Sequence, residues 1–175
     1  MEWRDFSKKI SKHFSGKAAS KDELALYAAV KEGNLSRVKY ILNNGVNPNI
    51  RGENNLTPAH HAAYWGEVKI LEQLIKHDAD INADNGNDRG WTPLHSAAIS
   101  GGLKKRKEVI ELLLKNNADI NKEDKFGWTP KDYMLLWEND PDAAAEFKNY
   151  ISKLTVNGAP PREPKKPTDF KTPKH

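Results

Sequence analysis

The chain has 175 residues, of which 30% are charged, and it contains no cysteine, so disulfides, thiolate metal sites and cysteine nucleophiles are excluded. Its formal net charge of +4 is unevenly spread: residues 1–21 carry 6 − 2 = +4, residues 158–175 carry 5 − 2 = +3, and the middle carries 17 − 20 = −3. The basic character therefore belongs to the two ends, and the body is a poor electrostatic match for nucleic acid.

No apolar run is long enough to span a bilayer, and the sequence does not open with a signal-peptide pattern. We therefore expect a soluble protein of the cytoplasm, with the nucleus as the alternative location.

Residues 1–21 form a basic extension with an amphipathic pattern. Helical spacing places its large apolar side chains on one face and its lysines elsewhere, the apolar side chains being Trp3, Phe6, Ile10 and Phe14. Three interpretations stay open. Such a helix covers the first structural unit of the chain, it binds an anionic membrane or a partner groove, or the segment is disordered.

A decapeptide occurs twice, as TPAHHAAYWG at 57–66 and TPLHSAAISG at 92–101. A looser copy covers 24–49 and a fourth begins at 126–134. The asparagines that close the first three copies, Asn49, Asn82 and Asn121, are 33 and 39 positions apart. A period of this length predicts an all-α repeat solenoid, with repeats at about 22–52, 53–86, 87–124 and 125–156.

Each copy predicts a pair of helices. Thr57 and Thr92 are suited to cap a helix whose first residue is proline, and Gly66 and Gly101 are suited to end it in a left-handed conformation. The alanines between them allow close approach of neighbouring helices. A second helix follows, with an apolar stripe at 70, 71, 74 and 75 in one copy and at 109, 110 and 112–114 in the next.

These motifs resemble the ankyrin repeat, whose hallmarks are T-P-L-H-x-A-A-x-x-G and a later G-A-D-x-N turn. The resemblance covers roughly residues 22–155 and is carried best by Thr92 to His95 and Ala118 to Asn121. It implies β-turn fingers before each helix pair, inner helices on a concave face, and a non-enzymatic module that binds another protein as an adaptor or inhibitor.

The fourth copy departs from the pattern, with Lys131 and Asp132 in place of Leu-His and Met134 and Leu135 in place of the alanines. It continues into a last helix from Asp140, and we interpret the whole as a C-terminal cap. Ser20 and Glu23 predict a capping box at the start of the first copy. Two copies carry insertions, one in the finger between Asn82 and Thr92 and one in the segment between the two helices of the third copy, and we expect both to be loops.

No catalytic or phosphate-binding motif is present, and we expect neither enzymatic activity nor a cofactor. His60, His61 and His95 suggest a metal site, but His60 and His95 occupy the T-P-x-H position, where the resemblance implies a hydrogen-bonded structural role instead. The acidic residues between Asp78 and Asp88 loosely resemble a calcium loop, but the glycine falls in the wrong place and no closing glutamate follows, so no metal is expected.

The resemblance also indicates the partner-binding positions, which flank each G-x-T-P motif or precede each helix-ending glycine. They are Glu53, Asn54, Leu56, Tyr64, Trp65, Asp88, Arg89, Trp91, Ile99, Ser100, Lys125, Phe126 and Trp128. Tryptophan, tyrosine and arginine are the side chains that dominate interface hot spots. The alternative is that Trp91 and Trp128 pack between adjacent fingers, or that Tyr64 and Trp65 are structural.

Two basic segments suggest a second function. The KKRK run at 104–107 resembles a nuclear-import signal, but we favour the interpretation that it is a solvated loop. Residues 157–175 form a Pro/Lys-rich tail that we expect to be disordered. Within the tail, Pro161, Pro164 and Lys166 fit a ligand of SH3-type domains. The alternative function is therefore a membrane-peripheral or nuclear-targeted scaffold that acts through its basic ends. We expect a monomer.

Overall fold

The computed structural model describes residues 20–86, 89–100, 103–136, 149–150 and 152–153. Within these ranges the secondary structure is helical, with no strand. A single 3-10 turn, η1, covers Glu53–Asn55, and the α-helices are α2 (Lys21–Lys31), α3 (Leu35–Asn43), α4 (Pro58–Trp65), α5 (Val68–Lys76), α6 (Pro93–Ala98), α7 (Leu103–Lys115) and α8 (Pro130–Leu136). None of the helices in the described part of the chain is long and apolar enough to cross a membrane.

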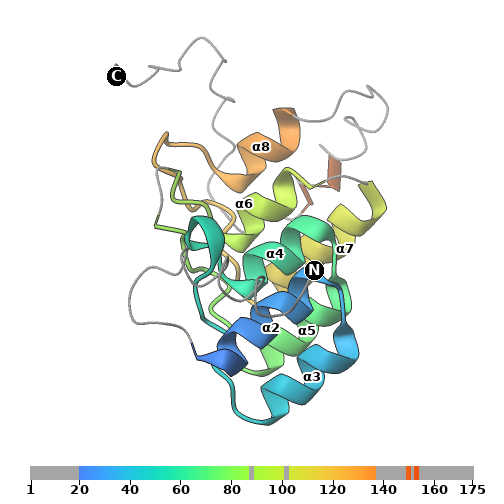
Figure 1. Cartoon of the computed structure of the whole chain (residues 1–175). Coiled ribbons are helices and arrows are strands. Elements are labelled where there is room, and N and C mark those ends of the chain that lie inside the picture. Colours follow the sequence, from blue (N-terminus) through green and yellow to red (C-terminus); the bar gives the residue numbers. More distant parts are fainter. Residues whose placement is uncertain (1–19, 87–88, 101–102, 137–148, 151, 154–175) are drawn as a thin grey trace.

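The helices form two layers that run along the stack (Figure 1). In the inner layer α2 packs on α4, α4 on α6 and α6 on α8, whereas in the outer layer α3 packs on α5 and α5 on α7. Each of the first three repeats contributes one helix to each layer, and the two helices of each of these repeats pack on one another. The fourth repeat contributes α8 to the inner layer. This arrangement confirms the predicted all-α solenoid.

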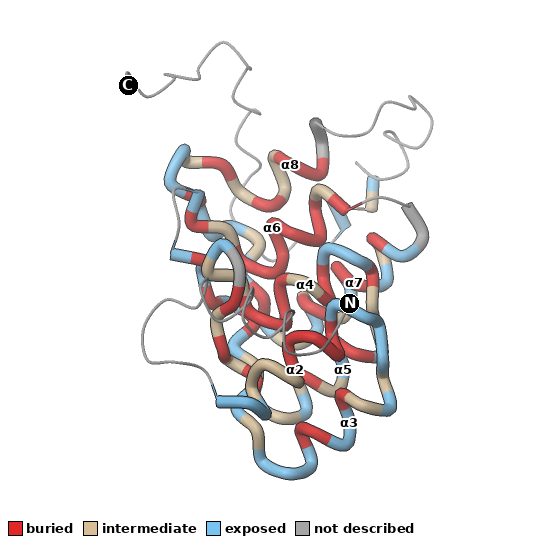
Figure 2. The backbone as a smooth tube through the Cα atoms, in the orientation of Figure 1, coloured by how far each residue is buried: buried red, intermediate tan, exposed pale blue. Residues whose placement is uncertain are grey.

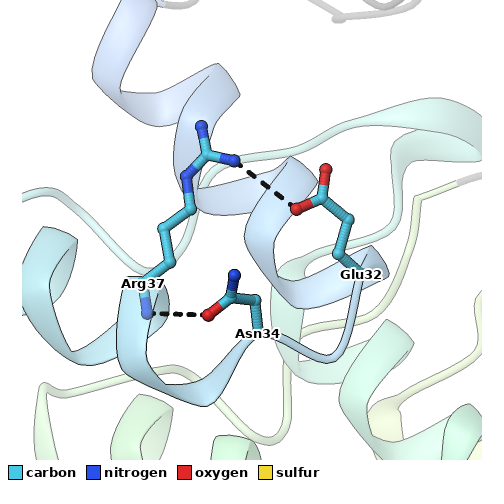
Figure 3. A network of polar contacts seen from close by, with 3 residues as sticks. All are labelled: Glu32, Asn34 and Arg37. Carbon is cyan, nitrogen blue, oxygen red and sulfur yellow. Dashed lines mark hydrogen bonds and ion pairs between the residues drawn. The ribbon is translucent and has the colours of Figure 1, made fainter.

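Local capping explains where the helices begin. Ser20 and Glu23 form the predicted capping box at α2, and Thr57 and Thr92 are the N-cap residues of α4 and α6. At α3 the Asn34 side chain accepts the backbone N–H of Arg37 at 3.0 Å. The Arg37 guanidinium also lies 3.4 Å from the Glu32 carboxylate (Figure 3). Both of these charged side chains are exposed to water, so the capping bond matters more than the ion pair.

Glycines in the left-handed conformation end the first inner helices, because a side chain is strained there. Gly33 has φ 67° after α2 and Gly66 has φ 71° after α4. Gly66 also lies against α7, since a Cβ atom there would come within 2.9 Å of the Lys105 Cβ. The equivalent Gly101 falls outside the described residues.

The core lies between the two layers (Figure 2). The inner helices supply alanines and the outer helices supply the predicted branched residues, of which Ile70, Leu71, Leu74, Val109, Ile110 and Leu113 are almost inaccessible to water. One further contact joins the first repeat to the next finger: a Cβ atom on Gly52 would come within 2.1 Å of the Tyr27 ring. Small residues therefore set the spacing between repeats.

The insertion between the helices of the third repeat is not a loop, which corrects the sequence-based prediction. Helix α7 has 13 residues where α3 and α5 each have 9, and its first residues include the KKRK run. Four residues make about one helical turn, so the extra turn leaves the apolar stripe on the same face. The Arg106 guanidinium is buried and donates two hydrogen bonds to the carbonyl oxygen of Ser100, at 3.0 and 2.7 Å. The run is therefore part of the fold rather than a solvated loop.

Asparagines bridge consecutive repeats. The Asn49 side chain donates to the carbonyl oxygen of Asp78 at 3.0 Å and accepts the backbone N–H of Asp80 at 2.7 Å. Asn82 repeats both bonds one unit later, with the carbonyl oxygen of Asn117 at 3.0 Å and the backbone N–H of Asp119 at 2.8 Å. Each bridge ties the turn after one outer helix to the turn after the next.

Three sequence-based predictions concern other parts of the chain. The amphipathic segment at 1–19 and the Pro/Lys-rich tail at 157–175 lie outside the described residues, as does most of the last helix, which is described only at 149–150 and 152–153.

We expect Asn82→Ala to lower the free energy of unfolding by about 1 kcal/mol, because it removes both hydrogen bonds of an exposed bridge. Urea denaturation measures the change. Asn121→Ala is the matched control: Asn121 is the equivalent residue in the third copy, and we expect a change of no more than about 0.5 kcal/mol. Equal losses for the two variants would contradict the bridging role of Asn82.

Candidate functional site

The fingers between the helix pairs are closed by similar main-chain bonds. Backbone N–H groups donate from Gly52 to Leu56 at 2.9 Å, from Asn85 to Trp91 at 2.8 Å and from Asp124 to Trp128 at 2.8 Å. The second finger has two more residues inside this closure, which places the predicted finger insertion there. A further bond, from the Lys125 N–H to the Arg89 carbonyl oxygen at 2.8 Å, joins two fingers directly.

The Asp124 carboxylate organises the third finger. Its Oδ1 accepts the backbone N–H groups of Phe126 at 2.8 Å and Trp128 at 2.9 Å. Its Oδ2 accepts the Trp91 indole N–H at 3.1 Å and the Tyr133 hydroxyl at 2.7 Å. Burial and the bond to Asp124 raise the pKa of Tyr133 above its ordinary value, so its hydroxyl stays protonated and donates. One buried carboxylate thus joins two fingers to α8.

Two inner helices, α4 and α6, are each connected to the next finger by one histidine. The Nδ1 of His60 accepts the backbone N–H of Thr57 at 3.2 Å, and its Nε2 lies 2.9 Å from the carbonyl oxygen of Trp91. His95 makes the same pair of bonds, with the Thr92 N–H at 3.1 Å and the carbonyl oxygen of Trp128 at 3.1 Å. A carbonyl oxygen only accepts hydrogen bonds, so Nε2 of each ring carries a proton. Because Nδ1 accepts a backbone N–H, it carries none, and both rings are therefore neutral.

Burial lowers the pKa of His60 from 6.5 to about 4 and lowers that of His95 as well, which agrees with this neutral form. The described residues hold no group of three or more His, Cys, Asp or Glu side chains that could bind a metal ion. The hydrogen-bonded structural role expected of His60 and His95 is confirmed.

The chain repeats one unit, which consists of a helix pair, a finger and a histidine that bonds to the next finger. Comparison with known proteins identifies this repeat. A family model described as ankyrin repeats (3 copies) matches residues 26–124, more than half of the chain. The chain belongs to the ankyrin-repeat family.

Individual ankyrin-repeat proteins show the same likeness. Ankyrin repeat and SAM domain-containing protein 6 of Rattus norvegicus is 33% identical over 118 residues, which is 67% of this chain and 13% of that protein. A putative ankyrin repeat protein of Rickettsia bellii is 33% identical over 132 residues, covering 75% of this chain and 48% of that one. The 26S proteasome non-ATPase regulatory subunit 10 of Dictyostelium discoideum is 34% identical over 91 residues, covering 51% and 37%.

This chain spans less than half the length of each of these relatives. The likeness therefore concerns the ankyrin repeats themselves. Ankyrin repeats are generally non-enzymatic modules for protein–protein interaction.

The structure leaves several predicted contact residues at the surface. Tyr64 and Trp65, at the end of α4, are 41% and 60% exposed, and their rings meet edge to face at 5.1 Å between centroids. Phe126 at the third finger is 40% exposed. Arg89 is exposed too, with its guanidinium 4.7 Å from the centre of the Trp91 ring. Asn54 and Lys125 complete the exposed set.

Other predicted contact residues are buried, and the expectation that they meet a partner is corrected. Trp128 is 3% exposed because it packs in the core beside Tyr133, and Ser100 is 1% exposed beneath Arg106. Trp91 is half-buried and donates to Asp124, so the alternative that Trp91 and Trp128 pack between fingers is the one observed.

The remaining predicted positions are intermediate or undescribed. Leu56 is half-buried, and Ile99 is half-buried against the core. The side chain of Glu53 and the whole of Asp88 lie outside the described residues.

Sequence reasoning missed the exposure of one residue and the burial of two others. Tyr40 on α3 is 71% exposed, the largest exposure among the described large apolar side chains, and it lies in the outer layer. Asp124 and Arg106 read as ordinary surface charges in the sequence, yet both are buried. A repeat-to-repeat alignment offers one signal, since Asp124 aligns with Gly52 and Asn85 at the closing bond of each finger.

We expect Asp124→Asn to lower the free energy of unfolding by about 2 kcal/mol. The substitution places an amide NH2 where Oδ2 accepts from Trp91 and Tyr133, so two buried donors lose their acceptor. Urea denaturation gives the change, and Glu108→Gln on the exposed side of α7 removes the same charge as a control. A loss no larger than that of the control would show that Asp124 does not organise the finger.

We expect the free energy of unfolding to fall as pH falls from 6.5 to 4. In this window the unfolded chain protonates His60 and the folded chain does not, whereas above 6.5 both states hold the ring neutral. At pH 4.5 the loss attributable to His60 is about 2 kcal/mol. Urea denaturation at pH 7 and 4.5 should therefore show a smaller pH effect for His60→Gln, which does not titrate. Identical pH effects in the two proteins would refute a lowered pKa at His60.

Proposed function

We propose that this chain is a non-enzymatic adaptor or inhibitor that binds one protein partner through its inner-helix ends and finger loops. The observation that carries the proposal is the pair of exposed aromatic rings of Tyr64 and Trp65. Other aromatic residues of the fingers and inner helices have structural partners, as Trp91 and Tyr133 do through Asp124. Tyr64 and Trp65 are absent from the buried core cluster and from the partly buried residues packed against it.

The position of the pair supports a role in binding. It lies at the end of α4, in the middle of the inner layer, and the fingers hold a cation and a further ring, Arg89 and Phe126, at the surface. Aromatic and arginine side chains supply most of the energy at protein interfaces because they bury large areas at little entropic cost. The main-chain bonds that close the fingers order the finger backbone before binding, which lowers the entropic cost of association.

We expect Tyr64→Ala combined with Trp65→Ala to weaken partner binding about 30-fold, the result of losing about 2 kcal/mol at a hot spot. Affinity capture from the native cell lysate identifies the partner by mass spectrometry, and titration with the purified partner then measures the affinity. Tyr40→Ala is the control, because Tyr40 is an exposed aromatic residue of the outer layer. Equal binding by the double variant, after circular dichroism confirms its fold, would contradict the proposal.

A further inference from the structure

Two exposed lysines accompany the exposed rings of Tyr64 and Trp65. A Cβ atom on Gly66, the residue after Trp65, would come within 2.9 Å of the Lys105 Cβ and 3.1 Å of its Cδ, so the Lys105 side chain lies along the turn between α4 and α5. Lys69 lies in the first turn of α5, four residues after Trp65. Both lysines are exposed. The two rings and the two lysines therefore gather around the same turn.

The fold does not account for these two lysines. Within the described part of the chain, neither Lys69 nor Lys105 has an ion-pair or hydrogen-bond partner. Each lies in the first turn of a helix that has no acidic residue there, where a positive charge opposes the helix dipole. By contrast, Lys107 of the same basic run lies 5.9 Å from the centre of the Tyr150 ring. Lys69 and Lys105 thus add positive charge to the surface without stabilising their helices.

Positive charge is concentrated at this end of the stack. Three equivalent segments, where an inner helix ends or an outer helix begins, carry together 6 − 3 = +3, and they are residues 31–37, 64–70 and 105–109. The middle of the chain as a whole carries 17 − 20 = −3, so the rest of that middle carries −3 − 3 = −6. The charge beside the rings is therefore opposite in sign to that of the repeats around it.

Two of the three acids in these segments lie away from the rings. The Glu32 carboxylate lies 3.4 Å from the Arg37 guanidinium. The Glu67 carboxylate lies against Gly33 of the preceding repeat, with its Oε1 3.4 Å from the place of a Cβ atom there. The third acid, Glu108, is exposed three residues beyond Lys105 on α7. A molecule that covers Tyr64 and Trp65 therefore meets mainly positive charge, which favours an anionic group.

The next repeat continues the apolar surface of the rings. Ile99 has the place in its decapeptide that Tyr64 has in the preceding one, and it is half-buried. The two inner helices that carry these residues, α4 and α6, pack side by side. Neighbouring helices are about 10 Å apart, a distance that an extended chain covers in about three residues. A segment that crosses from α4 to α6 can thus place an apolar side chain on the rings and an acid within about three positions of it.

We propose that the partner binds here through a short acidic segment. Its large apolar side chain packs on Tyr64 and Trp65, and an Asp or Glu nearby binds Lys105. This inference rests on the proposed function and adds the chemistry of the partner. A protein segment fits this surface better than an anionic bilayer does. A flat bilayer would also cover Glu32 and Glu67, whose carboxylates repel lipid phosphates, whereas a narrow segment passes beside them.

A random peptide library displayed on phage is the probe, with the full chain as bait. Peptides are kept when Tyr64→Ala combined with Trp65→Ala abolishes their binding, which restricts the set to this surface. We expect the kept peptides to be enriched in Asp and Glu close to a large apolar residue. Lys105→Glu should select Lys and Arg instead, and glutamate retains the Cβ and Cγ atoms that pack on Gly66. The matched control is Lys122→Glu, the same charge change on an exposed residue beyond the opposite end of α7.

Titration of one selected peptide then measures the contribution of Lys105. We expect Lys105→Glu to weaken binding about tenfold, because an attraction becomes a repulsion, and Lys122→Glu to change it by less than about twofold. A peptide whose acids are replaced by lysine should bind Lys105→Glu more tightly than it binds the wild type. Equal affinities of the wild type and Lys105→Glu for the acidic peptide would overturn the inference.

The selection also separates this inference from the proposed function. Peptides that need Tyr64 and Trp65 but show no preference for acids would overturn the acidic segment and leave the proposed function standing. Recovery of no peptide that needs the two rings would overturn the inference too, while capture of a partner from lysate through the same rings would still support the proposed function. Vesicles of phosphatidylserine and phosphatidylcholine are the second probe. Vesicle binding that the double ring variant loses would overturn the inference in favour of a membrane.

Discussion

Lateral packing between repeats is the constraint on which the rest of this structure depends. The inner helix α6 has six residues, and all of them are buried, so no side of this helix faces water. A helix pair of this size buries its apolar side chains only against the next pair. The alanines of the inner layer, the close contact of Gly52 with Tyr27 and the bridges of Asn49 and Asn82 all serve that one requirement.

The fold could be predicted from the sequence because its signals are local. Thr-Pro at a helix start and glycine at a helix end each involve a few consecutive residues, and the period in the low thirties is visible in the sequence itself. The insertion before Val109 was misjudged as a loop for a physical reason. Because the insertion is about one helical turn long, it extends α7 and leaves the apolar stripe on the same face. The extension depends on the hydrogen bond from Arg106 to the carbonyl oxygen of Ser100.

The candidate site was less predictable, because exposure depends on contacts between distant residues. Trp65 and Trp128 look equally suited to an interface in the sequence, yet one lies at the surface and the other in the core. The difference comes from Asp124, whose carboxylate draws two fingers and α8 together around the second tryptophan. Alignment of the repeats marks the place of Asp124 at the finger closure, but it does not show which groups the carboxylate binds, so the role of Asp124 appears only when the repeats are stacked.

Four of the side chains that bond between repeats share a feature with consequences for how such a chain can diverge. His60, His95, Asn49 and Asn82 all reach across to main-chain atoms of the neighbouring repeat, and none of them requires a particular side chain there. A mutation that changes the neighbour's side chain leaves its carbonyl and amide groups in place. Surface residues of the fingers can therefore be exchanged, and new recognition properties acquired, while the register of the stack is inherited unchanged.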